Sequence, residues 1–246
     1  MNGHHPSRVK SLDLMRDDPI VQRWSTARVE AFSDGVFAIA ITLLVLDIRI
    51  EPEQFDDLWH ALGQEWPAYL AYVTSFLTVG GVWLAHHSLF TRLRYVDPVL
   101  MRLNVLLLMV AAFLPFPTSL LAEAFHASRE AERAAVVAYG GTALLIELLL
   151  VAAVRYAIAH PELVDGEPLT TAARVRDRRG PVAAALYSAA LVIGILLLPR
   201  IAAVAYLLVA ARAVLLPGGE GRLSLTPARE RPSPPSPGRG TDRRRR

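Results

Sequence analysis

Long apolar runs constrain this sequence more than any other feature. Stretches of about 17 to 25 mostly apolar residues recur along it, and about 20 such residues are needed to cross a hydrocarbon core of about 30 Å. Hydrophobic residues make up 53% of the 246 residues, which exceeds the apolar share of an ordinary soluble domain. The chain is therefore predicted to be an all-α integral membrane protein.

The apolar runs predict six transmembrane helices, each bounded by charges or by Pro and Gly. The last two share one apolar stretch with only Pro199 and Arg200 between them, so one long kinked helix or a re-entrant pair stays an alternative. Pro115 and Pro117 are expected to kink the end of the third span. The predicted spans cover residues 29–50, 66–87, 100–121, 134–156, 181–198 and 200–216.

Arginine and lysine are distributed unevenly between the loops. They cluster before the first span and in the loops after the second and fourth spans, whereas the loop after the first span has only Arg49 among several acidic residues. Basic loops are retained on the cytoplasmic side of a membrane. Both termini are therefore predicted to be cytoplasmic, which agrees with an even number of spans.

The two ends of the chain differ in composition from the apolar middle. Residues 1–24 are polar and of mixed charge, so we expect no removable signal peptide and a disordered segment. Residues 217–246 are rich in Pro, Gly, Ser and Arg, and are expected to form a disordered basic tail. Residues 25–216 remain as the membrane domain. The chain has no Cys, which excludes disulfides, thiolate metal sites and cysteine nucleophiles.

The first span differs from the others because ionisable residues lie at its start. An ionisable residue such as Asp34 costs about 2.5 to 3.5 kcal/mol inside a membrane on insertion scales, so it is predicted to have a partner in the protein. At 100° per residue, one stripe of this helix mixes a small residue, a hydroxyl and large apolar side chains. The stripe contains Phe32, Gly35, Ile39, Thr42, Leu43 and Leu46.

The predicted topology brings further polar residues to the depth of Asp34. The start of the first span, the end of the second and the start of the third all lie at the cytoplasmic end, which places Asp34, His86, His87 and Asn104 together. We interpret them as a structural hydrogen-bond network between helices, with a proton relay or gate as the alternative. Adjacent histidines point about 100° apart, so no metal site is expected.

Two other polar features are interpreted as structural. The segment Thr78–Gly81 is similar to a potassium-channel filter sequence, but no pore helix precedes it, and exposed carbonyls would break the pairing that a span requires. We attribute its glycines to close helix packing. Glu147 lies in the middle of the fourth span, where we expect a hydrogen-bonded structural acid with Tyr139 and Thr142 nearby in sequence.

Four motifs together carry a resemblance that the periodicity does not give. They are Arg28, the Phe32-Ser33-Asp34 triplet with its run into Ile48, Trp83 with His86-His87, and Phe113-Leu114-Pro115-Phe116-Pro117. This combination resembles the transmembrane protein 175 family of potassium channels, and indicates a bacterial member. The similarity covers about residues 25–215.

The resemblance implies a six-helix subunit that assembles as a homotetramer around a pore lined by the first span. The resemblance also implies passive conduction that prefers potassium. It implies no re-entrant filter loop, no cofactor and no enzymatic activity. Matching from the Phe-Ser-Asp triplet places the hydrophobic constriction on Ile39, Leu43 and Leu46, and a selectivity layer on Thr42. A multi-pass location in the cell membrane is expected, with the bacterial inner membrane suspected.

The same resemblance implies a scaffold network that holds the first span in place. Its expected members are Arg28, Phe32, Ser33, Asp34, Trp83, His86, His87 and Asn104, and the two histidines cannot be separated from sequence. A secondary or proton-coupled transporter is the alternative function, although residues 29–121 and 134–216 lack the internal repeat that such proteins usually have. An intramembrane enzyme lacks a recognisable nucleophile and base pair.

Overall fold

The computed structural model describes residues 23–165, 179–196 and 198–215. These residues are helical or irregular, and form isolated β-bridges but no strand. The predicted tail at 217–246 and most of the predicted N-terminal segment at 1–24 lie outside them. The elements are α1 (Thr26–Leu43), η2 (Leu44–Asp47), η3 (Pro52–Asp57), α2 (Leu58–Gln64), α3 (Trp66–Phe90), α4 (Pro98–Phe113), α5 (Pro115–Ala124), α6 (Arg129–Ala159), η4 (Pro161–Leu163), α8 (Arg179–Leu196) and α9 (Pro199–Leu215).

Four segments of the described chain are long and apolar enough to cross a membrane, and they contain most of each of the first four predicted spans. The segments are Thr26–Asp47, Trp66–Phe90, Pro98–Ala124 and Arg129–Ala159. The helices α8 and α9 have 18 and 17 residues. At 1.5 Å per residue each is about 26 Å long, slightly less than a hydrocarbon core of about 30 Å. The chain is an all-α membrane protein, and the count of six spans stays a prediction.

Prolines divide the helices where the sequence predicts. The third predicted span breaks between α4, which ends at Phe113, and α5, which begins at Pro115, because proline lacks the N–H that would continue the ladder. Pro199 likewise begins α9. Since α8 and α9 pack against each other, they are two helices, and the alternative of one long kinked helix is wrong.

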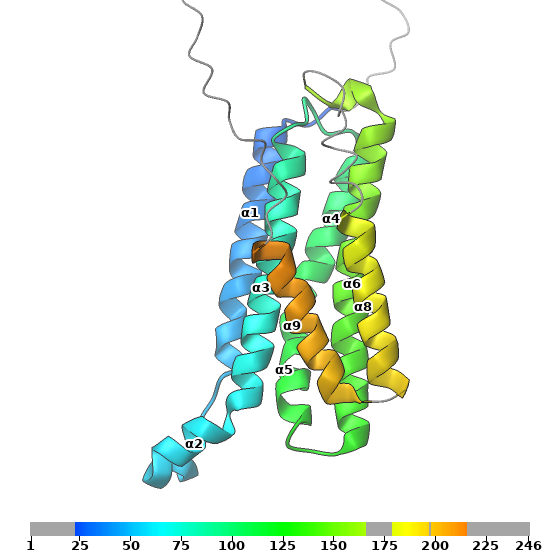
Figure 1. The fold of residues 1–246 in the computed structure, drawn as a ribbon. Coiled ribbons are helices and arrows are strands. Elements are labelled where there is room, and N and C mark those ends of the chain that lie inside the picture. The colour runs from blue at the N-terminus through cyan, green and yellow to red at the C-terminus, as the bar shows by residue number, and fades with distance from the viewer. Residues whose placement is uncertain (1–22, 166–178, 197, 216–246) are drawn as a thin grey trace, which may run out of the picture. The chain divides into compact units, whose positions relative to one another are not determined.

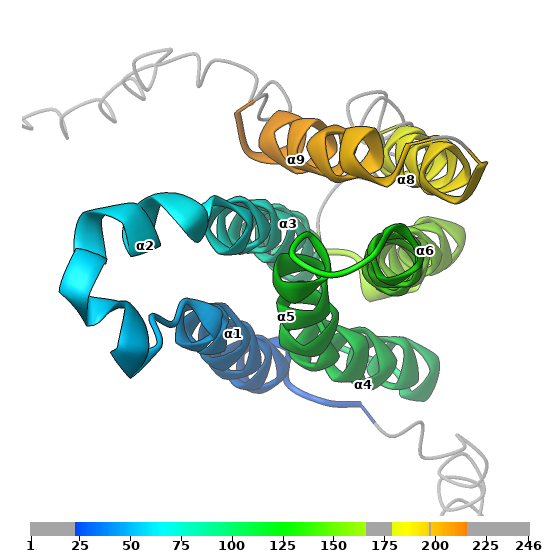
Figure 2. The same cartoon turned by 90° about the horizontal axis from the view of Figure 1, so that it is seen from below.

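The helices pack in three layers, which Figure 2 shows in end view. One layer holds α1 and α4, the middle layer holds α3, α5 and α6, and the third holds α8 and α9. Accordingly α1 packs on α3 and α4, whereas α8 packs on α6, and α9 packs on α3. Only 28% of the α1 span is buried, against 44 to 50% of the other three spans. The first helix therefore leaves one long face uncovered by its own subunit.

Hydroxyl groups connect the helices inside the bundle. Ser75 Oγ lies 2.8 Å from Thr118 Oγ1 and 3.3 Å from the Tyr139 hydroxyl, and Thr78 Oγ1 lies 3.2 Å from Tyr139 and 3.3 Å from Tyr187. All five side chains are buried. A buried hydroxyl needs a hydrogen-bond partner, and this network supplies it across α3, α5, α6 and α8.

Glycines allow two close contacts between helices. A Cβ at Gly81 would lie 2.9 Å from the Cβ of Ala213, whereas a Cβ at Gly80 would meet nothing within 4 Å. The packing role predicted for the Thr78–Gly81 segment is thus confirmed for Gly81. A Cβ at Gly140 would lie 2.0 Å from the hydroxyl oxygen of Tyr206, so α6 and α9 approach closely at this position.

Backbone hydrogen bonds join three segments at one end of the bundle. Trp24 and Val96 form an antiparallel bridge, with N–O distances of 3.0 and 3.1 Å. The Arg94 N–H donates to the carbonyl of Leu163 at 2.8 Å. These bonds hold the start of α1 against the α3–α4 loop and the segment after α6, and they include Trp24, which the sequence analysis assigns to the disordered segment. Figure 1 shows this end at the top.

Candidate functional site

The helix α1 has one buried face with a regular spacing. Its buried side chains follow one another at intervals of three or four residues, which is the period of a helix stripe. Ser33 is the polar member of this stripe. The buried residues are Val29, Ser33, Phe37, Ala40 and, in η2, Leu44.

The opposite face of α1 exposes large apolar side chains. Phe32 is 63% exposed, Ile39 62%, Leu43 42% and Leu46 57%. The helix tightens to a 3₁₀ turn in η2, where residues three apart eclipse one another, so Leu43 and Leu46 point in one direction. The stripe predicted from the sequence therefore coincides with the uncovered face.

Thr42 lies on this exposed face with its hydroxyl oriented by the helix. Its Oγ1 donates to the carbonyl of Ile39 at 2.9 Å. A hydroxyl has one hydrogen and two acceptor positions, so the oxygen keeps acceptor capacity on the exposed side. Such an oxygen suits a cation rather than an anion.

A buried hydrogen-bond chain fixes α1 to α4 and α3. Ser33 Oγ donates to the Val29 carbonyl at 2.8 Å and accepts from Asn104 Nδ2 at 3.1 Å. The other end of that amide, Asn104 Oδ1, lies 2.8 Å from His86 Nε2. Because the amide oxygen can only accept, Nε2 carries the hydrogen. His86 is also held by stacking on Phe90, with ring centroids 4.1 Å apart.

A second pair of contacts joins α1 to α3 nearer the surface. Trp83 Nε1 donates to Asp34 Oδ1 at 2.9 Å. One turn away, Glu30 Oε1 lies 2.7 Å from His87 Nδ1, outside hydrogen-bond geometry, so this contact is electrostatic when the ring is protonated. The structure therefore separates the two histidines: His86 lies in the buried chain, and His87 faces Glu30.

Glu30 is not among the residues predicted from the sequence, and two of the predicted residues lie outside the network that the described contacts form. Glu30 and Asp34 are four residues apart, as are Trp83 and His87, and this matching spacing is the signal that identifies the second pair of contacts. Arg28 is exposed and forms no ion pair with the residues that the structure describes, so its scaffold role stays a prediction. Phe32 lies on the exposed face instead.

Glu147 differs from its expected role. It is buried in α6, yet within the described residues it has no hydrogen bond or ion pair. Thr142 donates to the Ala138 carbonyl at 2.8 Å, and Tyr139 bonds to Ser75 and Thr78. The expected hydrogen bonds from these two hydroxyls are therefore wrong.

The fold and the site define a class of membrane protein: a helical bundle whose first helix is anchored by polar contacts on one side and leaves an apolar face free on the other. The chain belongs to the TMEM175 family. The family described as "Endosomal/lysosomal potassium channel TMEM175" matches residues 28–115. A crystal structure of a lysosomal potassium-selective channel TMEM175 homolog from Chamaesiphon minutus matches with a TM-score of 0.68 and 31% identity, covering 78% of this chain and 97% of that one.

Two curated relatives each match just under half of the chain. A potassium channel from Streptomyces collinus is 54% identical over 113 residues, which are 46% of this chain and 55% of the relative. The human endosomal/lysosomal proton channel TMEM175 is 44% identical over 120 residues, which are 45% of this chain and 23% of that protein. The sequence matches thus span only part of each relative. Both are named as channels, not as enzymes.

Proposed function

We propose that the chain is a subunit of a potassium-preferring cation channel that conducts passively through a homotetrameric pore. The exposed face of α1 is the observation that carries this proposal. It presents Phe32, Ile39, Leu43 and Leu46 to the outside of the subunit, while the buried face is fixed to α3 and α4. Four such helices around an axis bury these faces against one another.

The polar groups of α1 favour a pore over a face that contacts only lipid. Thr42 lies within the exposed apolar row and keeps acceptor capacity on its hydroxyl oxygen. Lipid offers no partner for that oxygen, whereas a permeating potassium ion does. A ring of Thr42 hydroxyls forms the proposed selectivity layer.

Rings of aliphatic side chains supply the proposed constriction. Ile39 lies about 16 Å from Arg28 along a helix that rises 1.5 Å per residue, which places it near the middle of the hydrocarbon core. Narrow aliphatic rings gate by dewetting. Ile39, Leu43 and Leu46 are therefore proposed as successive hydrophobic rings of one pore.

The proposed assembly has six spans per subunit and both termini in the cytoplasm, and lies in the bacterial inner membrane. Charge asymmetry between loops supports this orientation. The potassium preference is supported by the names of the Streptomyces relative and the Chamaesiphon structure. The permeant ion is the substrate, and the proposed partners are three further copies of the chain and the bilayer.

Liposomes test the function. Purified full-length protein is expected to dissipate a potassium gradient without a coupling ion, with a reversal potential that follows potassium more closely than sodium or chloride. Ile39→Asn is expected to hydrate the constriction and raise conductance, and Thr42→Ala to reduce selectivity. Thr142→Ala is the matched control, since Thr142 makes the same hydroxyl-to-backbone contact within α6. A reversal potential that shows no preference for potassium over sodium or chloride would refute the proposal.

The competing function is a secondary or proton-coupled transporter. Glu147 favours it, because a buried carboxylate at membrane depth that has no ion pair with the described residues is a typical proton-carrying group. A transporter accumulates potassium against its gradient when a pH gradient is imposed, and its rate saturates. The channel proposal predicts no such accumulation. It also predicts that the Glu147→Gln variant conducts potassium down its gradient, as the parent does.

A further inference from the structure

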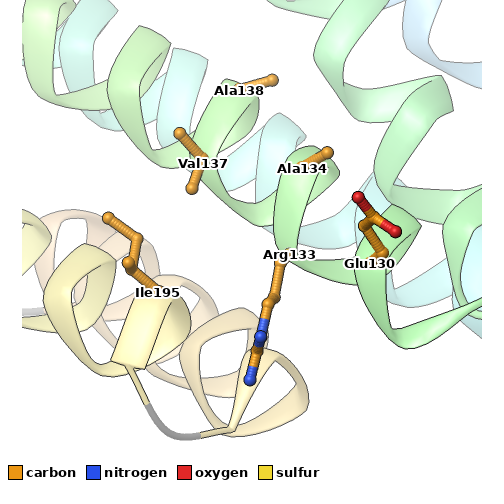
Figure 3. A pocket seen from close by; sticks show the side chains of 6 residues that line it. All are labelled: Glu130, Arg133, Ala134, Val137, Ala138 and Ile195. Carbon is orange, nitrogen blue, oxygen red and sulfur yellow. The ribbon is translucent and has the colours of Figure 1, made fainter.

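An apolar groove lies between α6 and α8, on the part of the bundle that does not contact α1. Its volume is about 490 Å³. Ala134, Val137 and Ala138 line it from α6, and Ile195 lines it from α8 (Figure 3). Because α1 packs on α3 and α4 and α8 packs on α6 and α9, the groove is remote from the proposed pore.

One end of the groove carries an unpaired positive charge. Arg133 is exposed and has no ion pair among the described residues, and in Figure 3 it extends toward the end of α8 whereas Glu130 extends in another direction. The nearby acid Glu132 is already paired, at 2.8 Å, with Arg200. Among the described residues, no carboxylate forms an ion pair with this guanidinium, and Glu130 is the acidic residue that also lines the groove.

The lining of the groove changes from charged to apolar with depth, as a bilayer leaflet does. Arg133 is the last charged residue before an apolar stretch that continues along α6 to residue 146. Arginine at such a boundary extends its head to the headgroup layer. Ala138 lies five residues further, about 7.5 Å deeper at 1.5 Å per residue, so the groove leads from headgroup level into the hydrocarbon.

We propose that this groove binds one phospholipid, with its phosphate at Arg133 and an acyl chain along the surface between Val137 and Ile195. A single guanidinium matches one phosphodiester, and the lining other than Arg133 and Glu130 is apolar. A protein partner would need a larger and more varied surface. The bound lipid would fill the seam between α6 and α8 without touching the proposed conduction path, so the inference is independent of the proposed function.

The experiment measures lipid retention by native mass spectrometry of the full-length protein purified in a mild detergent. The probes are dioleoylphosphatidylglycerol and dioleoylglycerol, which share their acyl chains but differ in the phosphate-bearing headgroup. Arg133→Gln is expected to lower the preference for the phosphate-bearing lipid roughly tenfold, the effect of one charge-assisted hydrogen bond. Val137→Trp, which fills the groove, is expected to reduce the retention of both lipids.

Two matched control variants change an arginine and add a tryptophan outside the groove. Arg155→Gln removes an exposed arginine near the other end of α6, and Leu148→Trp enlarges an exposed side chain outside the groove. Both are expected to retain the two lipids as the parent does. Equal lipid preference in Arg133→Gln and the parent, or equal loss in the controls, would overturn the proposal.

Discussion

The substitution Gly140→Ala is expected to destabilise the bundle, because a side chain at this position collides with Tyr206. The new Cβ would lie 2.0 Å from the Tyr206 hydroxyl oxygen and 2.6 Å from its Cζ. The ring has little freedom to move: it is fully buried, it packs near Tyr139 and Tyr187, and its hydroxyl donates to the Val136 carbonyl at 3.2 Å. Either the ring or the helix must shift.

The size of the effect follows from that distance. A carbon and an oxygen in contact are about 3.3 Å apart or more, so the hydroxyl must move by about 1.3 Å. Overpacking of this kind costs about 1 to 3 kcal/mol, and the better helix propensity of Ala offsets up to about 1 kcal/mol. With the full offset the net loss is up to about 2 kcal/mol, which lowers Tm by up to about 4 to 8 °C in a domain of this size.

Thermal unfolding in detergent, followed by size-exclusion chromatography, measures this loss. Gly141→Ala is the matched control, because a Cβ there meets nothing within 4 Å; its Tm is expected to equal or exceed that of the parent. Adding Tyr206→Phe to Gly140→Ala removes the closest atom and is expected to restore part of the loss. Equal Tm values for Gly140→Ala and Gly141→Ala would refute the packing argument.

Two further predictions concern the contacts that hold α1. Asn104→Ala removes both hydrogen bonds to Ser33 and His86 and leaves buried polar groups unpaired, so it is expected to cost about 1 to 3 kcal/mol; an unchanged unfolding temperature would exclude the scaffold role. Asp34→Asn keeps an oxygen that accepts from Trp83, whereas Asp34→Ala does not, so the yield of folded assembly, measured by size-exclusion chromatography, is expected to fall only in the alanine variant. Equal yields in the two Asp34 variants would argue against the hydrogen bond.

The helix positions follow from local signals in the sequence. The start of α4, for example, is marked by Asp97, whose carboxylate accepts from the Leu100 N–H at 2.8 Å, and by Pro98 at the first helical position. Its end is marked by Pro115. Such signals act within a few residues, so they are readable without knowledge of the fold.

The partners of the polar residues depend on how neighbouring helices are rotated, which local patterns leave undetermined. Two adjacent histidines point about 100° apart, so only the packing of α3 against α1 decides that His86 meets Asn104 and His87 meets Glu30. The exposed stripe of α1 was predictable because it needs only the helical period. For the polar residues, the depth at which their partners lie could be predicted from the sequence, but the partners' identity could not.

The error at Glu147 has a similar cause. Thr142 is close in sequence, but its hydroxyl is used by the carbonyl four residues back, as is common for Thr within helices. Tyr139 lies eight residues away, about 12 Å along the helix at 1.5 Å per residue, and its hydroxyl joins the network of α3. Proximity in sequence was therefore a poor guide to hydrogen bonding along α6.

A single cysteine at Ile39 tests the central claim most directly, because the chain has no cysteine of its own. If four α1 helices surround the pore, Ile39→Cys brings four thiols together, and thiolates bind soft metal ions tightly. Cd²⁺ is then expected to block the potassium current of Ile39→Cys in liposomes, and to leave the parent and Leu148→Cys, an exposed position on α6, unaffected. A current through Ile39→Cys that Cd²⁺ does not reduce would contradict a pore lined by α1.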